Sequence, residues 1–530
     1  MHTPTAELSP LGLAVIPAYF LTTLVIGWLS RRRTANAGQY LNASRSISMG
    51  VVAASFLSAN CGALEIVGLS AMAAEYGVQA FHFYWIGAIP GMVFLALWMI
   101  PVYRQSGVHS VPEYLEVRYD RRVRLLNAYV SAIVMLMLSG ISLYAMAQVL
   151  HVLVGLQFWV GALISAVVVL VYVLMGGVRA TIYNEVFQLV VMVAGLAPIF
   201  VRTVGIVKSG APLPGMQGHL WSRLPLVDPH GQMDLTGVML GLGFVLSFSY
   251  WGTDFVQIQR ALAARTLAEA RQVPLWAGFG KLAFSLLVVI PGLAAIHTLP
   301  QLGTVQRFDQ ALPAMMTLFY SPTLLGLGLT ALVASLMSGL AANISAFAAV
   351  WTQDIYRTHL RPGRTERHYL YIGKLATIVA MGIGIAECTS SFYFSNLMEQ
   401  VQLIFSLFGA PFWAIFLLGM TTRRTTARGA FLGFLCGAGV SLAHESAVML
   451  RLIRYGSIMN ANFHIALYSF GIALVVASLA STEPERETAP QPAPMRLTLR
   501  EGLRGEKIGR LLVLSALLLA ICALLNFAWR

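Results

Sequence analysis

Charged residues are scarce in this chain. Asp, Glu, Lys and Arg together make up 11% of its 530 residues, against about 25% in soluble domains. Hydrophobic residues make up 57%, and the mean hydropathy is +0.72. A composition this poor in charge excludes a soluble globular protein and predicts an all-α integral membrane protein embedded in the lipid bilayer.

Cysteine is also rare, with four residues in the whole chain. Because Cys61, Cys388, Cys436 and Cys522 all fall within apolar runs, they predict packing residues and no disulfide framework or metal cluster. The sequence has no Walker loop and no G-x-S-x-G nucleophile elbow. These absences argue against an enzyme.

Acidic residues are fewer than basic ones, and the formal net charge is +13. The basic residues gather in alternate loops, such as "YRTHLRPGRTERH" and "TTRRTTARG", which is the pattern of membrane topology and not of nucleic-acid binding. The first apolar run ends in "RRR" with no cleavage site, which indicates a retained span. The positive-inside rule then predicts a multi-pass protein of the cell (inner) membrane with both termini outside.

Apolar runs long enough to span a bilayer, about 20 residues each, predict about fourteen transmembrane helices in a single polytopic transporter domain, 1–530. They lie near residues 10–30, 48–74, 78–103, 124–153, 156–176, 181–206, 235–258, 273–299, 323–350, 369–389, 397–420, 429–449, 463–480 and 509–528. Between the last two, the Pro-rich and charged segment 481–507 predicts a cytoplasmic linker. In the loop 104–123, Pro112 predicts the start of a short interfacial helix.

Two of these spans contain glycine beside polar residues. The second carries "NCGALEIVG" with Gly62 and Gly68, and the seventh carries "SFSYWGTDFVQIQR" with Gly252. Glycine permits a helix to unwind, and interrupted helices at corresponding positions of two halves indicate an inverted-repeat transporter with a site at the membrane midplane. The pattern predicts a first repeat over 48–206 and a second over 235–420. Packing glycines in a helix bundle are the alternative.

Several separated motifs resemble the sodium/solute symporter family, which includes bacterial sodium-coupled carriers for galactose, proline and sialic acid. They are "MGGVRATIYNEVFQ" (175–188), "SYWGTDFVQIQRALAARTLAEAR" (249–271), "GKLAFSLLVVIPGLAA" (280–295) and "ALVASLMSGLAANISAFAAVWTQDIY" (331–356). The resemblance runs from about residue 10 to about residue 440. It implies a LeuT-like inverted-repeat fold, with one leading helix, five plus five core helices and about three trailing helices.

The resemblance also implies a sodium site, and Na⁺ would be the co-transported ion. Ser58 and Cys61 fall at backbone-carbonyl positions of that site, Ser335 falls at another carbonyl position, and Ser338 falls at the first hydroxyl position. The second hydroxyl position, usually Ser or Thr in the family, is Gly339 here, so the site has one oxygen fewer. Serines that bond back to their own helix carbonyls are the alternative interpretation.

For the solute, similarity to the galactose carrier implies a pocket formed by a set of polar and aromatic residues. These are Asn60, Glu65, Tyr84, Tyr250, Lys281 and Gln402. Tyr250 matches the family's aromatic inner gate. Amide, carboxylate, phenol and ammonium groups can hydrogen-bond a polyol, but Lys281 could equally hold a small carboxylate, and Glu65 with Lys281 could be a structural ion pair.

Three further acids lie inside or close to apolar runs. Glu185 stands where the family has Asp, and it predicts either a second ion site or exit path, or a residue at a cytoplasmic helix start near Arg179. Asp254 and Asp354 lie close to cytoplasmic helix ends and are interpreted as structural residues.

The sequence and this resemblance therefore predict a sodium-coupled symporter of a small polar organic solute, a sugar or sugar-like molecule, that works by alternating access. A proton-coupled or weakly sodium-coupled carrier of a small carboxylate or amino acid is the alternative, motivated by Gly339. The expected partners are the solute and the bilayer, with no nucleic acid and no obligate protein partner.

Overall fold

The structure, a computed structural model, describes a chain that is almost wholly helical. It covers residues 8–31, 47–62, 64–105, 111–209, 218–222, 224–304, 307–394, 396–422, 424–481 and 508–529. Within these ranges, the only bridge between extended segments pairs Ile47 with Ala264. The basic loop after the first span, 32–46, and most of the expected linker, 482–507, lie outside the described residues.

The helices follow one another with short connections. Up to residue 209 they are α1 (Pro10–Arg31), α3 (Met49–Asn60), η2 (Leu64–Gly68), α4 (Leu69–Tyr76), η3 (Gly77–Phe81), α5 (His82–Trp85), α6 (Ile89–Phe94), η4 (Leu95–Met99), α7 (Ile100–Gln105), α8 (Val111–Arg118), α9 (Arg121–Val154) and α10 (Phe158–Ser209). After it they are η6 (Gly237–Leu246), α11 (Ser247–Thr253), α12 (Phe255–Leu262), α13 (Leu267–Thr298), η7 (Phe308–Gln310), α14 (Ala311–Phe319), α15 (Pro322–Val350), η8 (Trp351–Leu360), α16 (Glu366–Glu387), η9 (Ser390–Tyr393), α17 (Leu397–Ile404), η10 (Phe405–Gly409), α18 (Ala410–Thr421), α19 (Ala427–Met449), α20 (Ile458–Leu479) and α22 (Ile508–Ala528).

In the described part of the chain, eleven helical segments are long and apolar enough to cross a membrane. Three shorter apolar helices, Met49–Asn60, Phe158–Leu174 and Gly237–Thr253, coincide with three further spans that the hydropathy pattern predicts. The all-helical, multi-pass character expected from composition is confirmed. The total of fourteen spans and the grouping into five plus five stay predictions.

One boundary expected from the sequence is absent. The hydropathy pattern places a loop between residues 176 and 181, but α10 continues through it as one helix of 52 residues. At 1.5 Å per residue that length rises about 78 Å, more than twice the roughly 30 Å of a hydrocarbon core. The helix contains two apolar stretches, Phe158–Leu174 and Val178–Ser209, which coincide with the two predicted spans.

The first interruption lies where the sequence predicts it. α3 ends at Asn60, two bend residues follow, and the chain resumes as the π-helical segment η2 before it enters α4. The break frees backbone carbonyls that a continuous helix would use internally.

The second interruption falls two residues after the predicted glycine. Gly252 is still helical and buried within α11, and the break is at Asp254, whose extended backbone (φ −69°, ψ 116°) separates α11 from α12. The Asp254 carboxylate accepts a hydrogen bond from the Gln257 backbone N–H at 3.0 Å and so caps α12. A Cβ built on Gly252 would lie 3.5 Å from the Trp413 ring, an ordinary van der Waals contact, so the packing around this position does not require glycine.

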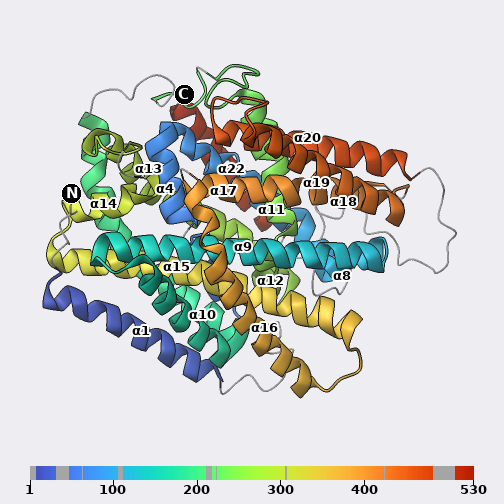
Figure 1. The fold of residues 1–530 in the computed structure, drawn as a ribbon, viewed down its shortest axis with the longest axis horizontal. Coiled ribbons are helices and arrows are strands. Elements are labelled where there is room, and N and C mark those ends of the chain that lie inside the picture. Colours follow the sequence, from blue (N-terminus) through green and yellow to red (C-terminus); the bar gives the residue numbers. More distant parts are fainter. Residues whose placement is uncertain are drawn as a thin grey trace.

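The long helices surround the two broken ones. Figure 1 shows α9 and α15 running side by side through the middle of the molecule, with α1, α10 and α16 below them and α18, α19 and α20 above. α10 packs against α15, and α19 pairs with α20. α8, which contains Pro112, is the short helix expected in the loop 104–123.

The last helix, α22, packs against α13. Two side-chain contacts tie it to the rest of the molecule: the Cys522 thiol donates to the Trp85 carbonyl at 2.8 Å, and the Trp221 indole donates to Asn526 at 3.0 Å. All four cysteines are free, and Cys436 is exposed while the others are buried.

Candidate functional site

A cavity lies between the two broken helices. Its wall includes Asn60 and Glu65 from the first break, Tyr250 and Asp254 from the second, and Lys281 from α13. The space open to water inside it is about 130 Å³, whereas one water needs roughly 10–15 Å³ on the same measure. The cavity therefore has room for several waters or one small organic molecule.

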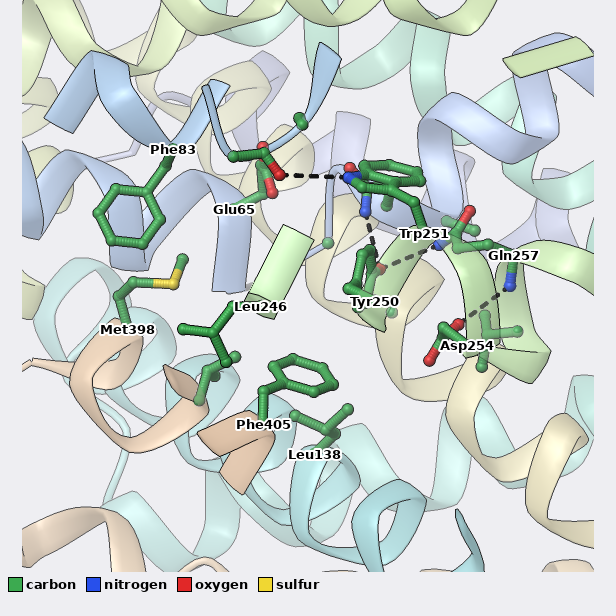
Figure 2. A pocket seen from close by; sticks show the side chains of 18 of the residues that line it. Glu65, Phe83, Leu138, Leu246, Tyr250, Trp251, Asp254, Gln257, Met398 and Phe405 are labelled. Carbon is green, nitrogen blue, oxygen red and sulfur yellow. Dashed lines mark hydrogen bonds between the residues drawn. The ribbon is translucent and has the colours of Figure 1, made fainter. Parts of the chain in front are cut away.

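Lys281 is the centre of the polar network in this cavity, in which Figure 2 labels its partner Glu65. Its ammonium contacts the Glu65 carboxylate at 2.6 Å and also donates to the Asn60 side-chain oxygen. The rings of Tyr84 and Trp251 lie 5.1 Å and 5.6 Å from the same nitrogen, within the range of a cation–π interaction.

The pairing explains how the membrane interior tolerates Glu65. A lone carboxylate at the bilayer centre costs roughly 2.5–3.5 kcal/mol on insertion scales. Here the Lys281 side chain is 4% exposed and the Glu65 side chain 12%, so the two opposite charges lie in contact at the wall of a cavity. The structural ion pair anticipated as an alternative is present, and Glu65 still lines the cavity.

Tyr250 joins the two breaks. Its hydroxyl oxygen accepts hydrogen bonds from the side-chain amides of Asn60, at 2.8 Å, and Gln257, at 3.2 Å. Its ring packs edge-on against Phe405, with ring centroids 5.2 Å apart. Since two donors already point at the oxygen, the hydroxyl proton is directed elsewhere and can be donated to a bound molecule.

The other two residues proposed for the solute differ in position. Gln402 lines the cavity, and its amide reaches the Met398 sulfur at 3.4 Å. Tyr84 is completely buried and is not part of the cavity wall; it lies behind the Lys281 ammonium. The structure thus brings five of the six residues to one cavity and places Tyr84 against the lysine that faces it.

The four residues proposed for sodium also meet. The Ser338 hydroxyl donates to the Ser58 carbonyl at 3.2 Å and lies 3.3 Å from the Ser58 hydroxyl. The Ser335 hydroxyl donates to the Cys61 carbonyl at 3.0 Å. All four are buried, so carbonyls of the first break face hydroxyls of α15. Hydroxyl and carbonyl oxygens suit a hard cation such as Na⁺.

Gly339 stands where the two backbones come close. A Cβ built on Gly62 would lie 3.1 Å from the Gly339 Cα and 3.6 Å from the Ser335 carbonyl oxygen. The missing side chain at Gly62 therefore lets the first break approach α15 at Gly339. The approach brings the carbonyls toward Ser335 and Ser338.

Glu185 has a partner that sequence reasoning missed. Its carboxylate is completely buried and pairs with Arg260, with an Nη2–Oε1 distance of 2.6 Å and Nε contacts of 3.1 and 3.2 Å. The Ser55 hydroxyl donates to the same carboxylate. Glu185 lies well inside α10 and not at a helix start; Arg179 instead lies over the Tyr183 ring.

Four more residues line the cavity that the sequence analysis did not assign to it. Trp251, Gln257 and Asn343 line the wall, as does Asp254, which was interpreted only as structural and does cap α12. Trp251, Asp254 and Gln257 all belong to the motif that contains Tyr250, and Asp254 and Gln257 follow Tyr250 by four and seven residues, the spacing of one helix face. Asn343 carried no signal beyond its position one turn after Gly339.

A family profile, the sodium:solute symporter family, matches residues 40–437. Among curated proteins, the chain is 27% identical over 459 residues to a sodium/glucose cotransporter of Vibrio parahaemolyticus, covering 80% of this chain and 83% of that protein. It is 28% identical over 480 residues to a sodium/mannose cotransporter of Bos taurus, covering 83% and 79%.

Solved structures share the fold. A Na⁺-coupled sialic acid symporter in a substrate-bound, outward-open state matches with a TM-score of 0.76 at 19% identity, over 92% of this chain and 99% of that one. Mhp1, a nucleobase-cation-symport-1 family transporter in a closed conformation, matches with a TM-score of 0.51 at 12% identity, over 86% and 96%. Since the family profile covers more than half of the sequence, this chain belongs to the sodium:solute symporter family.

Proposed function

We propose that this protein is a sodium-coupled symporter that carries a small polar, uncharged solute, sugar or sugar-like, by alternating access. Its family consists of transporters, which move solutes across membranes and are not enzymes. The observation that carries the proposal is the adjacency of two sites at the first break: oxygens that suit Na⁺ on one side, and the polar cavity on the other.

The charge balance of the cavity supports a neutral solute over a carboxylate. The Lys281 ammonium already forms an ion pair with Glu65 and donates a hydrogen bond to Asn60. It is therefore not a free cation that could bind an anionic solute. The remaining oxygen of Glu65, the Tyr250 hydroxyl and the Gln402 amide offer both acceptors and donors. The faces of Tyr250 and Phe405 in the same wall suit the apolar face of a sugar ring.

The arrangement at the first break also supports coupling to sodium. Ser335 and Ser338 hydrogen-bond to the carbonyls of Cys61 and Ser58, so an ion that enters would replace these two hydrogen bonds with ion–oxygen contacts. It would thereby fix the first break against α15, beside Asn60 and Glu65 of the cavity. This gives a physical route by which sodium binding favours the state that binds solute.

The test is uptake into proteoliposomes of labelled D-galactose, D-glucose and a short-chain carboxylate. We expect sugar uptake that needs a sodium gradient and fails with potassium. Ser338→Ala should raise the half-saturating sodium concentration by about tenfold, because one ligand oxygen is lost. Uptake that ignores the change from sodium to potassium and collapses with a proton ionophore would favour the proton-coupled alternative.

A further inference from the structure

The cavity wall includes one acid that forms no ion pair with any residue that the structure describes. Three of its lining residues carry a formal charge: Glu65, Lys281 and Asp254. Lys281 neutralises Glu65. Asp254 forms no ion pair within the described residues. A carboxylate at a cavity wall that forms no ion pair attracts a cation.

Gln257 adds an oxygen with no partner to the same wall. Asp254 and Gln257 have the spacing of a capping box, in which the side chain at the later position returns to the amide at the earlier one. Here the Asp254 amide instead donates to the Tyr250 carbonyl at 2.9 Å, and the Gln257 amide group turns to the Tyr250 hydroxyl. The Gln257 side-chain oxygen is left buried and without a partner, in a residue that is 1% exposed.

These two oxygens are connected to the sodium residues by one face of α15. Ser335, Gly339 and Asn343 follow one another at intervals of four residues, so they share a helix face. Gly339 and Asn343 line the cavity, and Ser335 contacts the first break. A cation that leaves the serines along this face moves through the cavity in which Asp254 and Gln257 lie.

We propose that Asp254 and the side-chain oxygen of Gln257, with the amide of Asn343 in the same wall, form a second sodium position. Figure 2 shows Asp254 and Gln257 on one side of Tyr250 and Glu65 on the other. Carboxylate and carboxamide oxygens are the ligands that a hard cation takes. This inference rests on the proposed sodium coupling and gives the released ion its next position.

Glu185 does not take this role, because Arg260 already neutralises its carboxylate. The position at Asp254 is also a weak one. One carboxylate oxygen of Asp254 already accepts a hydrogen bond from the Gln257 backbone N–H. The N-terminal end of α12 also carries partial positive charge. Both features oppose tight binding, so the ion stays briefly and moves on.

Thallium, a monovalent cation with strong anomalous scattering, is the direct probe. Crystals of the full chain grown in thallium should show anomalous density at Ser338 and a second, weaker peak between Asp254 and the Gln257 oxygen. The second peak should vanish in Asp254→Asn. Gln257→Glu adds a carboxylate there and should strengthen it.

Sodium-22 exchange across proteoliposomes measures the functional consequence. We expect Asp254→Asn to slow exchange by roughly tenfold, the lower end of what local charge contributes to ion capture, while the half-saturating sodium concentration at equilibrium stays within about twofold. Gln257→Leu should slow exchange in the same direction and serves if Asp254→Asn does not fold. Asp228→Asn, which removes an acid from a loop outside the cavity, is the matched control and should behave like the wild type.

Thallium density at Ser338 without density at Asp254 overturns the inference, and so does exchange at the wild-type rate in both cavity variants. In either case the proposed function survives if Ser338→Ala still impairs sodium dependence. Uptake that needs no sodium, with density at neither place, removes the proposed function and this inference together.

Discussion

Lys281 holds several roles at once, and its contacts decide what the cavity can bind. The ammonium touches Glu65 and Asn60 and faces two aromatic rings. A cation engaged on all these sides has little capacity left for a solute carboxylate. Its neighbours Glu65 and Asn60, by contrast, keep polar atoms at the cavity wall.

The ion pair predicts an asymmetry between variants. Glu65→Gln or Lys281→Met alone leaves one buried charge unpaired, which costs about 3–5 kcal/mol. The double variant removes both charges and should recover most of that loss. Thermal melting of the purified proteins measures it. Two single variants that melt like the wild type would show that the pair is not buried in the folded protein.

Transport separates the structural role of Glu65 from a role in binding. If Glu65 also contacts the solute, the double variant should fold but bind solute more weakly, with a raised half-saturating solute concentration. Recovery of folding together with wild-type affinity would make Glu65 a purely structural residue.

A side chain at Gly62 is predicted to displace the first break from α15. In Gly62→Ala the new Cβ would lie 3.1 Å from the Gly339 Cα, a backbone contact that cannot yield by a rotamer change. The first break would be pushed away from α15, lengthening the distance between the Ser58 and Cys61 carbonyls and the two serines. We expect sodium to stabilise this variant against heat several-fold less effectively than the wild type. Gly50→Ala, where nothing lies within 4 Å, is the matched control.

Buried polar groups link helices that are distant in sequence. The Glu185 carboxylate on α10 pairs with Arg260 of α12 and accepts a hydrogen bond from Ser55 of α3. This one acid therefore connects α10 to both broken helices, through α3 of the first and α12 of the second. At another corner of the molecule, the Asp309 carboxylate in η7 accepts the Leu397 amide at the start of α17, at 2.9 Å.

Asp309 gives a prediction about pH. Burial raises its pKa to about 6, although the Arg307 guanidinium opposes the shift. Because the pKa in the folded state lies above the ordinary value of 3.8, the folded state favours the protonated acid. Its contribution to stability is therefore fully present below about pH 4 and is lost as the pH rises through 6.

The measurement is the melting temperature of the wild type and of Asp309→Asn between pH 4 and 8. A shift of roughly two units corresponds to about 3 kcal/mol, so the difference between the two proteins should change across pH 4–6 and stay constant above pH 7. A constant difference over the whole range would contradict a raised pKa.

For the molecule as a whole, two breaks and the helices around them share the site. α3 and α11 each stop near the middle of the cavity, α13 supplies Lys281, and α15 supplies the serines. Residues from 58 to 402 therefore meet in one place, and no segment of the chain holds the site alone.

The positive-inside rule makes a prediction for the orientation of the whole chain. Both termini should face outward, because the basic loops follow the odd-numbered spans. Alkaline phosphatase, which is active only outside the cytoplasm, should be active when fused after Arg530. A fluorescent protein that matures only in the cytoplasm should be active when inserted into the loop 361–365 between η8 and α16. The opposite pattern would reverse the topology.

Much of the fold follows from the sequence because lipid imposes simple rules. Backbone groups in hydrocarbon must be satisfied within a helix, so apolar length predicts helices well, and the glycine and polar residues near Gly62 predicted the first break. The second break was placed two residues early, at Gly252, because the sequence does not show whether a glycine serves packing or unwinding. Only the structure shows that Gly252 stays helical and that the backbone turns at Asp254.

The tertiary structure alone decided which polar groups pair. Glu185 and Arg260 are 75 residues apart and pair because their helices cross. The Glu65–Lys281 pair was one of the alternatives that the sequence left open, and the structure selected it. The sequence by itself determined that the membrane interior holds these charged and polar groups, at a cost that requires partners. It did not determine the partners, because complementarity between two buried side chains exists only when their helices lie in contact.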